Sequence, residues 1–375
     1  MRMPATAARA RTELELQLTL GPALMMTRGY ASAEAAAAYR RAHALCDQVG
    51  DSPEALSALW RIHMFHLIRG ELHVARATAE QLLAATSRMQ NVDLLVEAHL
   101  AVGAPLLYQG RLADGRRHLE DAIARFDPER YSRHAFVYGQ DPLVVGLSYL
   151  AWVLMLQGNE FEALASLERA SRRAEVIGHD FSRAFALYFA AVVSDLREDF
   201  GVMLEYAERL IALADERQFP FWRVGGMALR GRALAAQGRH AEGLELMTTG
   251  LELSRAASAG AATMYFLRNI ADAFRAIGSV DEALGAVAEG LDACERQDNR
   301  SGESELHRIR GELLAADPAT SGAAEESFRR ALALAREQGS ILYARRAAAG
   351  LAAYLRDRGR VAEAEQVLAE VMERP

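Results

Sequence analysis

The amino-acid sequence predicts an all-α fold, a right-handed α-solenoid of about nine helical hairpins with a period of about 40 residues. Three observations support this prediction. Turn residues recur at a regular interval, apolar residues recur at the spacing of one helix face, and Gly or Ala recurs where two helices would cross. One hairpin cannot bury its apolar face alone, so we expect neighbouring hairpins to stack into one continuous array.

The regular turn sets the length of each element. A unit of about 40 residues has room for two helices of about 15 residues and two turns. Glycine fits the turn because it ends a helix in a left-handed backbone conformation at little steric cost. The turn residues, at successive intervals of 41, 40, 48, 40, 40, 40, 40 and 41 residues, are Gly29, Gly70, Gly110, Gly158, Glu198, Gly238, Gly278, Pro318 and Gly359.

Apolar and small residues define the faces of these helices. Leu147, Leu150 and Leu154 lie three or four residues apart and therefore share one helix face. Small side chains stand before and after most turns, because only Gly or Ala avoids a clash where two helices cross closely. His63 and Met203 occupy two of these sites instead, so we expect the repeat to open or shift register there. The small residues are Gly103, Ala151, Ala191, Gly231, Ala271, Gly311 and Ala352 before the turns, and Ala75, Gly115, Ala163, Gly243, Ala283, Ala323 and Ala364 after them.

The one long interval between turns predicts an irregular insertion. The interval from Gly110 to Gly158 exceeds the others by about eight residues, and the excess falls at 127–142, DPERYSRHAFVYGQDP. Irregular loops of this kind often carry function. The alternative interpretation is a packed connector between two repeats. The candidate functional residues of this loop are Tyr131, His134, Tyr138, Gln140 and Asp141.

Composition excludes several classes of function. All 43 basic residues are arginine, and the absence of lysine excludes a P-loop nucleotidase and Schiff-base chemistry. The net charge of −7 argues against a nucleic-acid or anionic-membrane partner. Cys46 and Cys294 make neither a disulfide framework nor a zinc knuckle, so we expect a reducing, cytoplasmic location. No stretch approaches the ~18 consecutive apolar residues of a membrane span.

No motif in the sequence indicates catalysis or a metal site. The patterns G-x-S-x-G, H-E-x-x-H and G-x-G-x-x-G are all absent from the sequence. His63 and His66 lie three residues apart and His73 follows, but a metal needs a further ligand that the sequence does not place. A hydrogen-bonded structural role is therefore favoured for these histidines, and we predict neither a metal nor a cofactor.

The hairpin with small residues at these spacings resembles the tetratricopeptide repeat (TPR). The unit is longer than that family's usual repeat, and the closing Pro is missing. More narrowly, the segments 11–30, 132–142 and 242–255 resemble the C-terminal helical repeat region of bacterial cyclase- or ATPase-type signalling regulators. The cyclase and ATPase parts themselves are absent, so their activities do not carry over. The resemblance implies one superhelical domain over 1–375, in which we expect 1–11 to be flexible.

The resemblance also implies a ligand groove, because the first helix of each TPR hairpin lines the concave face. Carried over position by position, this groove has an aromatic, Met-bearing half followed by a charged half. Such a groove suits an amphipathic ligand whose apolar part packs on aromatic rings while a carboxylate pairs with Arg232 or Arg268. The groove residues are Trp60, Met64, Tyr108, Trp152, Met155, Phe185, Tyr188, Asp195, Arg232, Tyr265, Arg268 and Asp272.

Each half of this groove has a structural alternative. The aromatic residues are also compatible with ordinary core packing between repeats. Arg232 and Arg268 are also compatible with intramolecular pairing, and Asp272 lies one helical turn from Arg268.

The prediction for function is a non-catalytic scaffold that binds a protein or peptide partner in bacterial signalling or regulation. A second interpretation is a regulatory domain that senses a small amphipathic molecule or a peptide. A third is an enzyme on a helical-repeat scaffold, with acid–base groups drawn from His134, Tyr138, Asp141 and Asp195. We expect the uncapped ends of the solenoid either to expose an apolar face or to pair in a homodimer.

Overall fold

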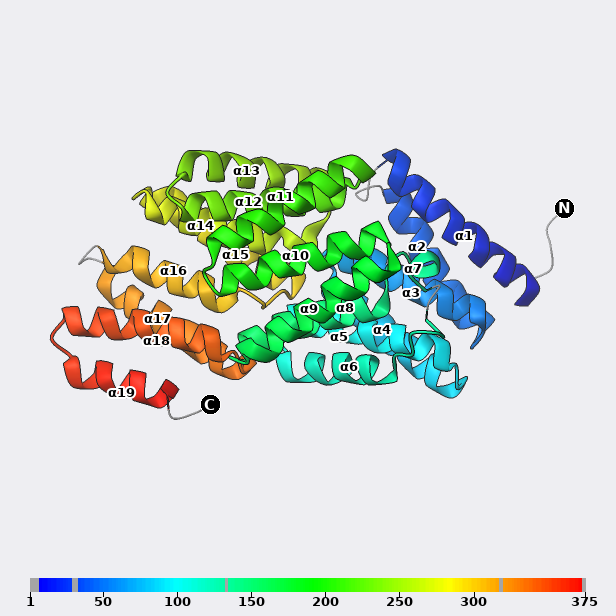
Figure 1. Ribbon diagram of the computed structural model, residues 1–375, viewed down its shortest axis with the longest axis horizontal. Helices are drawn as coiled ribbons and strands as arrows, with labels where there is room; N and C mark the ends of the chain where they lie inside the picture. The colour runs from blue at the N-terminus through cyan, green and yellow to red at the C-terminus, as the bar shows by residue number, and fades with distance from the viewer. Residues whose placement is uncertain (1–6, 29–32, 132–133, 317–319, 373–375) are drawn as a thin grey trace.

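The computed structural model describes residues 7–28, 33–131, 134–316 and 320–372, and every regular element in these ranges is a helix (Figure 1). The predicted all-α fold is therefore confirmed. The helices are α1 (Ala7–Arg28), α2 (Ala33–Val49), α3 (Pro53–Ile68), α4 (Leu72–Arg88), α5 (Val92–Tyr108), α6 (Leu112–Arg125), α7 (His134–Tyr138), α8 (Pro142–Leu156), α9 (Glu160–Ile177), α10 (Asp180–Leu196), α11 (Phe200–Arg217), α12 (Pro220–Ala236), α13 (His240–Ala256), η1 (Gly260–Ala262), α14 (Thr263–Ala276), α15 (Val280–Gln297), α16 (Glu303–Ala315), α17 (Ser321–Gln338), α18 (Ile341–Asp357) and α19 (Val361–Met372).

Consecutive helices pack as nine pairs in the described part of the chain, α1 with α2 through α18 with α19, with α7 and η1 standing outside the pairs. The predicted turns separate the two helices of a pair: Gly110 and Gly158, for example, have φ values of 75° and 80°. Glu198 adopts the same left-handed conformation at φ 61°. Gly29 and Pro318 lie outside the described residues. We expected residues 1–11 to be flexible; residues 7–11 form the first turns of α1, and residues 1–6 are not described.

Small residues permit the close crossings within the pairs, as the sequence predicts. A Cβ atom added to Gly243 of α13 would lie 2.5 Å from the carbonyl oxygen of Gly231 in α12, so no larger side chain fits. At the site of α3 that corresponds to Gly231, His63 is buried, and its Nδ1 lies 2.9 Å from the carbonyl oxygen of Ala75, the residue that corresponds to Gly243. A hydrogen bond to the opposing backbone therefore accommodates the one large polar side chain in this series.

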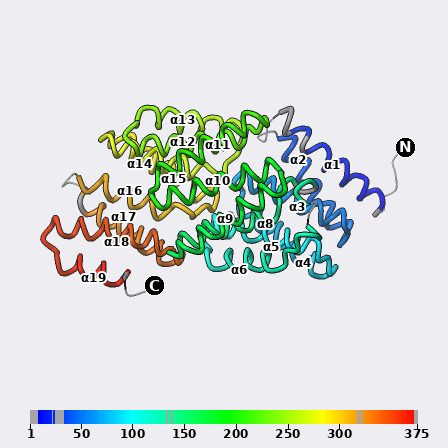
Figure 2. Tube along the Cα trace, in the orientation of Figure 1, coloured from blue at the N-terminus to red at the C-terminus, as the bar shows by residue number. Residues whose placement is uncertain are grey.

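The array curves back on itself, so that its later repeats touch the ends of earlier helices (Figures 1 and 2). We call the resulting line of contacts the seam. The last residues of α5, α8 and α10 are Tyr108, Leu156 and Leu196, and the carbonyl oxygen of each accepts a hydrogen bond from far along the chain. The donors are Arg300 N at 2.7 Å, Ser340 Oγ at 3.4 Å and Arg346 Nη2 at 2.8 Å, in that order.

The seam continues to α3, and one apolar core runs beneath it. A Cβ atom on Gly260 of η1 would lie 2.3 Å from the carbonyl oxygen of Arg69, just after α3. The core cluster that contains Trp152 of α8 also contains Leu351 and Tyr354 of α18. Early and late repeats are thus packed together around the inner face of the array. None of the helices in the described ranges is long and apolar enough to cross a membrane.

Candidate functional site

The first helices of successive pairs form the inner face, and its early part is an aromatic cluster. Tyr108 and Trp152 have ring centroids 5.2 Å apart, and Phe185 and Trp222 have centroids 5.6 Å apart at an interplanar angle of 77°. Tilted and edge-to-face pairs of this kind are favourable arrangements for aromatic rings. The members of the aromatic cluster are Tyr108, Tyr149, Trp152, Phe185, Tyr188, Phe189 and Trp222. Three of them, Tyr149, Phe189 and Trp222, were not among the groove residues predicted from the sequence.

The predicted apolar groove residues differ in how much surface they keep. Trp152, Met155 and Phe185 are buried in the core, with exposed fractions of 8%, 5% and 7%. Trp60, Met64, Tyr108 and Tyr188 are only partly buried and pack against the core from its edge. The half-buried residues are therefore the ones that a ligand can reach without displacing core side chains.

A small cavity of about 40 Å³ lies on this inner face among α3, α5, α8 and α10, large enough for a few water-sized groups. Three of its polar groups come from Glu97, His63 and Gln140. Most of the remaining wall is apolar. The lining residues are Trp60, His63, Met64, Leu67, Glu97, Leu100, Ala101, Ala104, Gln140, Val145, Tyr149 and Phe185.

Burial shifts the pKa values of two polar side chains of the cavity. Burial lowers the pKa of His63 to about 4, so its ring is neutral at pH 7. Because a carbonyl oxygen only accepts, Nδ1 of His63 carries the proton and donates to Ala75, which leaves Nε2 as an acceptor. Burial raises the pKa of Glu97, opposed by hydrogen bonds from His134 and Trp60.

The late half of the inner face is an ionic network of alternating charges. Asp195 accepts from Arg232 at 3.1 Å, from Arg268 at 2.7 Å and from the hydroxyl of Tyr265 at 3.1 Å. Arg232 also donates to Asp272 at 2.8 Å. The network then continues through side chains of α14, α16 and α18. Its members are Asp195, Arg232, Arg268, Asp272, Arg275, Glu305, Arg308, Glu312 and Arg346.

The two arginines that we expected to receive a ligand carboxylate are both paired within the protein. Asp272 was the expected partner of Arg268, one helical turn away, but it pairs with Arg232 of the preceding repeat. Arg268 instead pairs with Asp195, which lies on α10 two repeats earlier. The curvature of the inner face brings these repeats together, whereas spacing along one helix only ranks neighbours on that helix.

Asp272 gives the network a measurable acid dependence. Burial acts to raise its pKa, but Arg232 and Arg275 outweigh this and lower the pKa to about 2 from an ordinary 3.8. The ionised Asp272 carboxylate stabilises the folded protein fully above about pH 4, and this stabilisation is lost as the pH falls through 2. The reason is that Asp272 binds a proton at a higher pH in the unfolded chain than in the folded protein. We expect the difference in unfolding free energy between the wild type and Asp272→Asn to shrink by about 2 kcal/mol from pH 6 to pH 2. Urea titrations across this range measure it, and a pH-independent difference would contradict it.

The predicted functional loop is built mainly of structural contacts. The hydroxyl of Tyr131 donates to the carbonyl oxygen of Val92 at 2.7 Å, and its ring is fully buried. Asp141 caps α8 by accepting from Val144 N at 3.0 Å, and Arg173 donates to its other oxygen at 2.8 Å. The described contacts at Tyr131 and Asp141 are those of a packed connector, and the short helix α7 takes up extra residues of the long interval.

One other residue of that loop lines the inner cavity, and a second contacts a lining residue. Gln140 lines the cavity, and His134 of α7 lies 3.3 Å from Glu97 Oε1 through its Nδ1. The side chain of Tyr138 lies outside the described residues. The acid–base groups considered for an enzyme are therefore distributed: His134 pairs with Glu97, while Asp195 belongs to the ionic network. Within the described ranges no group of three or more His, Cys, Asp or Glu side chains is placed to hold a metal.

Glu97 is a further inner-face residue that the sequence did not identify, besides the three aromatic residues named above. It stands in the apolar run of α5 and lies 13 residues before Gly110, at one of the positions that the TPR resemblance places on the concave face. A single acid within such an apolar run was the signal that the sequence offered.

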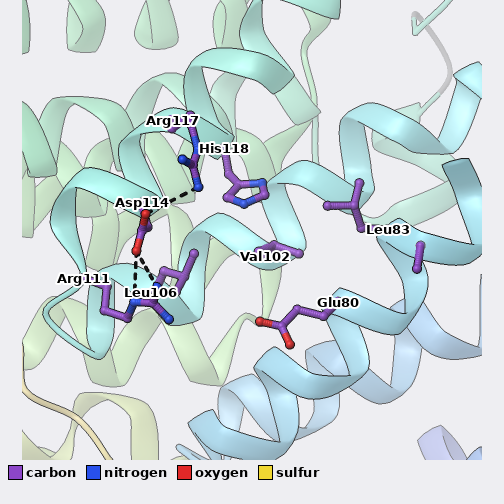
Figure 3. A pocket seen from close by; sticks show the side chains of 9 residues that line it. Glu80, Leu83, Val102, Leu106, Arg111, Asp114, Arg117 and His118 are labelled. Carbon is purple, nitrogen blue, oxygen red and sulfur yellow. Dashed lines mark hydrogen bonds and ion pairs between the residues drawn. The ribbon is translucent and has the colours of Figure 1, made fainter.

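A second, larger groove of about 400 Å³ lies on the outside between α4 and α6. Its charges are largely paired, with Asp114 contacting both Arg111 and Arg117 (Figure 3).

Comparison with known proteins places this fold. No protein-family model matches the chain, and no curated protein is significantly similar to it in sequence. A Rap protein complexed with competence and sporulation factor matches with a TM-score of 0.63 at 12% identity, over 96% of this chain and 98% of the other. NprR in complex with its cognate peptide NprX matches with a TM-score of 0.56 at 12% identity, over 86% and 89%.

A third match carries the family name that the sequence suggests. A STAND signal-transduction ATPase with a tetratricopeptide repeat sensor, from Pyrococcus horikoshii, matches with a TM-score of 0.51 at 13% identity. The match covers 96% of this chain, which spans about half of that protein (52%). The chain is accordingly a TPR-like helical-repeat solenoid, as predicted.

Proposed function

We propose that this protein is a non-catalytic, peptide-binding signalling regulator that captures an extended peptide on its inner face. The observation that carries the proposal is the inner face itself, where half-buried Trp60 and Met64 line a small cavity and half-buried Tyr108 and Tyr188 pack against the edge of the core. The similarity in fold to proteins solved with a bound peptide or factor supports it. Extended peptides bind well to such surfaces because aromatic and Met side chains provide apolar contact area.

The two halves of the inner face contribute differently to binding. Each arginine of the ionic network already has a carboxylate partner, so a ligand carboxylate gains little by replacing it. The half-buried apolar residues, by contrast, lose water when a ligand covers them. We therefore assign most of the binding free energy to the apolar half of the inner face.

A random peptide library displayed on phage and selected on the full chain tests this proposal. The best enriched peptide, synthesised with a fluorophore, is then titrated against variants. Trp60→Leu and Met64→Ala should each weaken binding at least tenfold, because each removes contact area near the cavity (about 1.4 kcal/mol or more).

Phe161→Ala on α9, the second helix of its pair, is the matched control, since this aromatic side chain is 83% exposed and lines neither the cavity nor the aromatic cluster. Its affinity for the peptide should equal that of the wild type. Selection without any enriched sequence, or equal effects of the inner and outer substitutions, would refute peptide binding at this face. A small-molecule screen by thermal shift on the same protein then addresses the sensing alternative.

A further inference from the structure

Glu97 is the exception among the buried acids. Its side chain is completely inaccessible, and its ion-pair partner among the described residues is His134, not an arginine. The other buried acids within the described ranges each pair with an arginine: Asp141 with Arg173, Asp195 with Arg232 and Arg268, Glu303 with Arg300, and Glu305 with Arg308. A buried carboxylate without a full cationic partner is costly, so its presence here calls for a reason.

The second oxygen of this carboxyl group lacks a hydrogen-bond partner among the described residues. Oε1 of Glu97 lies 3.3 Å from Nδ1 of His134, whereas Oε2 is buried and has no hydrogen-bond partner among the described residues. The same residue lines the inner cavity, together with Gln140 and the neutral His63. Trp60 donates a hydrogen bond to Glu97, but Oε2 of Glu97 has no partner in the described part of the chain. A hydrogen-bond donor with positive charge, supplied by a ligand, would complement this oxygen.

The walls of the cavity select the kind of donor. Trp60, Tyr149 and Phe185 surround it with aromatic rings, whose faces attract cations. Its volume of about 40 Å³ admits a small head group rather than a whole side chain. Met64 and Leu67 add apolar wall that suits a methylene stem. An ammonium group on a short aliphatic stem satisfies the charge, the aromatic walls and the size together.

We infer that the cavity around Glu97 is a binding subsite for a primary ammonium group, carried by the bound peptide as its amino terminus or a lysine side chain. This inference rests on the proposed peptide-binding function but names a site that can be tested without any peptide. The ammonium donates to Oε2 of Glu97, and Nε2 of His63 and the Gln140 carboxamide are further acceptors. Where the ammonium is the amino terminus, the subsite places that end of the peptide in the apolar half of the inner face.

The first experiment uses n-butylammonium as the probe and the full chain labelled with ¹³C at the methionine methyl groups. We expect the Met64 methyl resonance to shift saturably with n-butylammonium, and at least fivefold more weakly with 1-butanol, which has the same stem without the charge. In Glu97→Gln, binding of n-butylammonium should weaken at least tenfold. Glu168→Gln, at a 67% exposed site, should behave as the wild type.

Equal responses to the amine and the alcohol, or an unchanged response in Glu97→Gln, would overturn the subsite. If Glu97→Gln fails to fold, Glu97→Leu replaces it, since Glu97 has no arginine partner that its removal would leave as an unpaired buried cation. This variant should bind 1-butanol at least as well as the wild type while losing the response to n-butylammonium.

The second experiment separates this inference from the proposed function. Synthetic peptide libraries with free or acetylated amino termini, each with and without lysine, are captured on wild type and Glu97→Gln. Loss of capture on acetylation assigns the ammonium to the peptide terminus, and dependence on lysine assigns it to a side chain. Peptides captured equally well without any amine overturn the subsite and leave peptide binding intact. A response to n-butylammonium without capture of any peptide supports the subsite and refutes the peptide as its ligand.

Discussion

Replacing Asp195 by Ala is expected to lower the free energy of unfolding by about 3–5 kcal/mol. The carboxylate is 5% exposed and holds Arg232, Arg268 and the hydroxyl of Tyr265. Removing it leaves Arg268, itself 8% exposed, as a buried cation without its carboxylate. The cost of that uncompensated charge, rather than the worth of the original pair, sets the size of the effect.

Chemical denaturation at pH 7, followed by circular dichroism, measures this change. Glu168→Ala is the control: it removes one member of a surface pair with Arg172 in which both side chains are 67% exposed, and it should cost less than about 1 kcal/mol. The double variant Asp195→Ala/Arg268→Met should recover part of the loss, because it removes one stranded cation. A loss below 1 kcal/mol in Asp195→Ala would show that water reaches the network and solvates its charges.

Trp152→Ala is expected to be similarly severe, with a loss of about 3–5 kcal/mol. Trp152 is 8% exposed, contacts the rings of Tyr108 and Phe189, and lies in the core that joins α8 to α18. Alanine leaves a cavity that the surrounding rings cannot fill without moving. This is why the binding experiments use the half-buried Trp60 and Met64, whose substitution does not empty the core.

Comparing the stability of Trp152→Ala with that of Phe161→Ala separates the effect of burial from the effect of losing an aromatic side chain. Phe161 is 83% exposed on α9, so its replacement should change the unfolding free energy by no more than about 0.5 kcal/mol. Trp152→Phe should fall between the two, since it keeps one ring of the cluster. Similar stabilities for the Trp152→Ala and Phe161→Ala variants would mean that the aromatic cluster is not packed around Trp152.

The repeat was predictable because its signals are local. Two features depend only on side chains within one hairpin: the turn residue every 40 residues, and the close helix crossing at small residues such as Gly231 and Gly243. Each recurs often enough along the sequence to be recognised. The position of α7 was predictable only as an excess of residues in one interval. Even His63, which breaks the small-residue rule, could be flagged from sequence, although its hydrogen bond to Ala75 could not.

The partners on the inner face were much less predictable. Asp195 and Arg268 are 73 residues apart in sequence and meet because of how the array curves. That curvature accumulates from small rotations between repeats, which leave no pattern in the sequence. Inner-face positions could be predicted from the sequence, but their partners could not. Glu97 was not predicted, because it stands out only by comparison with the other buried acids of the described residues, each of which pairs with an arginine.

The seam has a consequence for how the chain acquires its structure. In a simple linear array each repeat contacts only its neighbours, so folding can start anywhere and spread. Here the carbonyl groups of Tyr108 and Leu156 receive donors from Arg300 and Ser340, 184 residues further on in the second case. Contacts of such long range form late and slow the folding of a domain. During synthesis on the ribosome, the carbonyl groups at the ends of α5 and α8 can therefore form these hydrogen bonds only after the second half of the chain has been made.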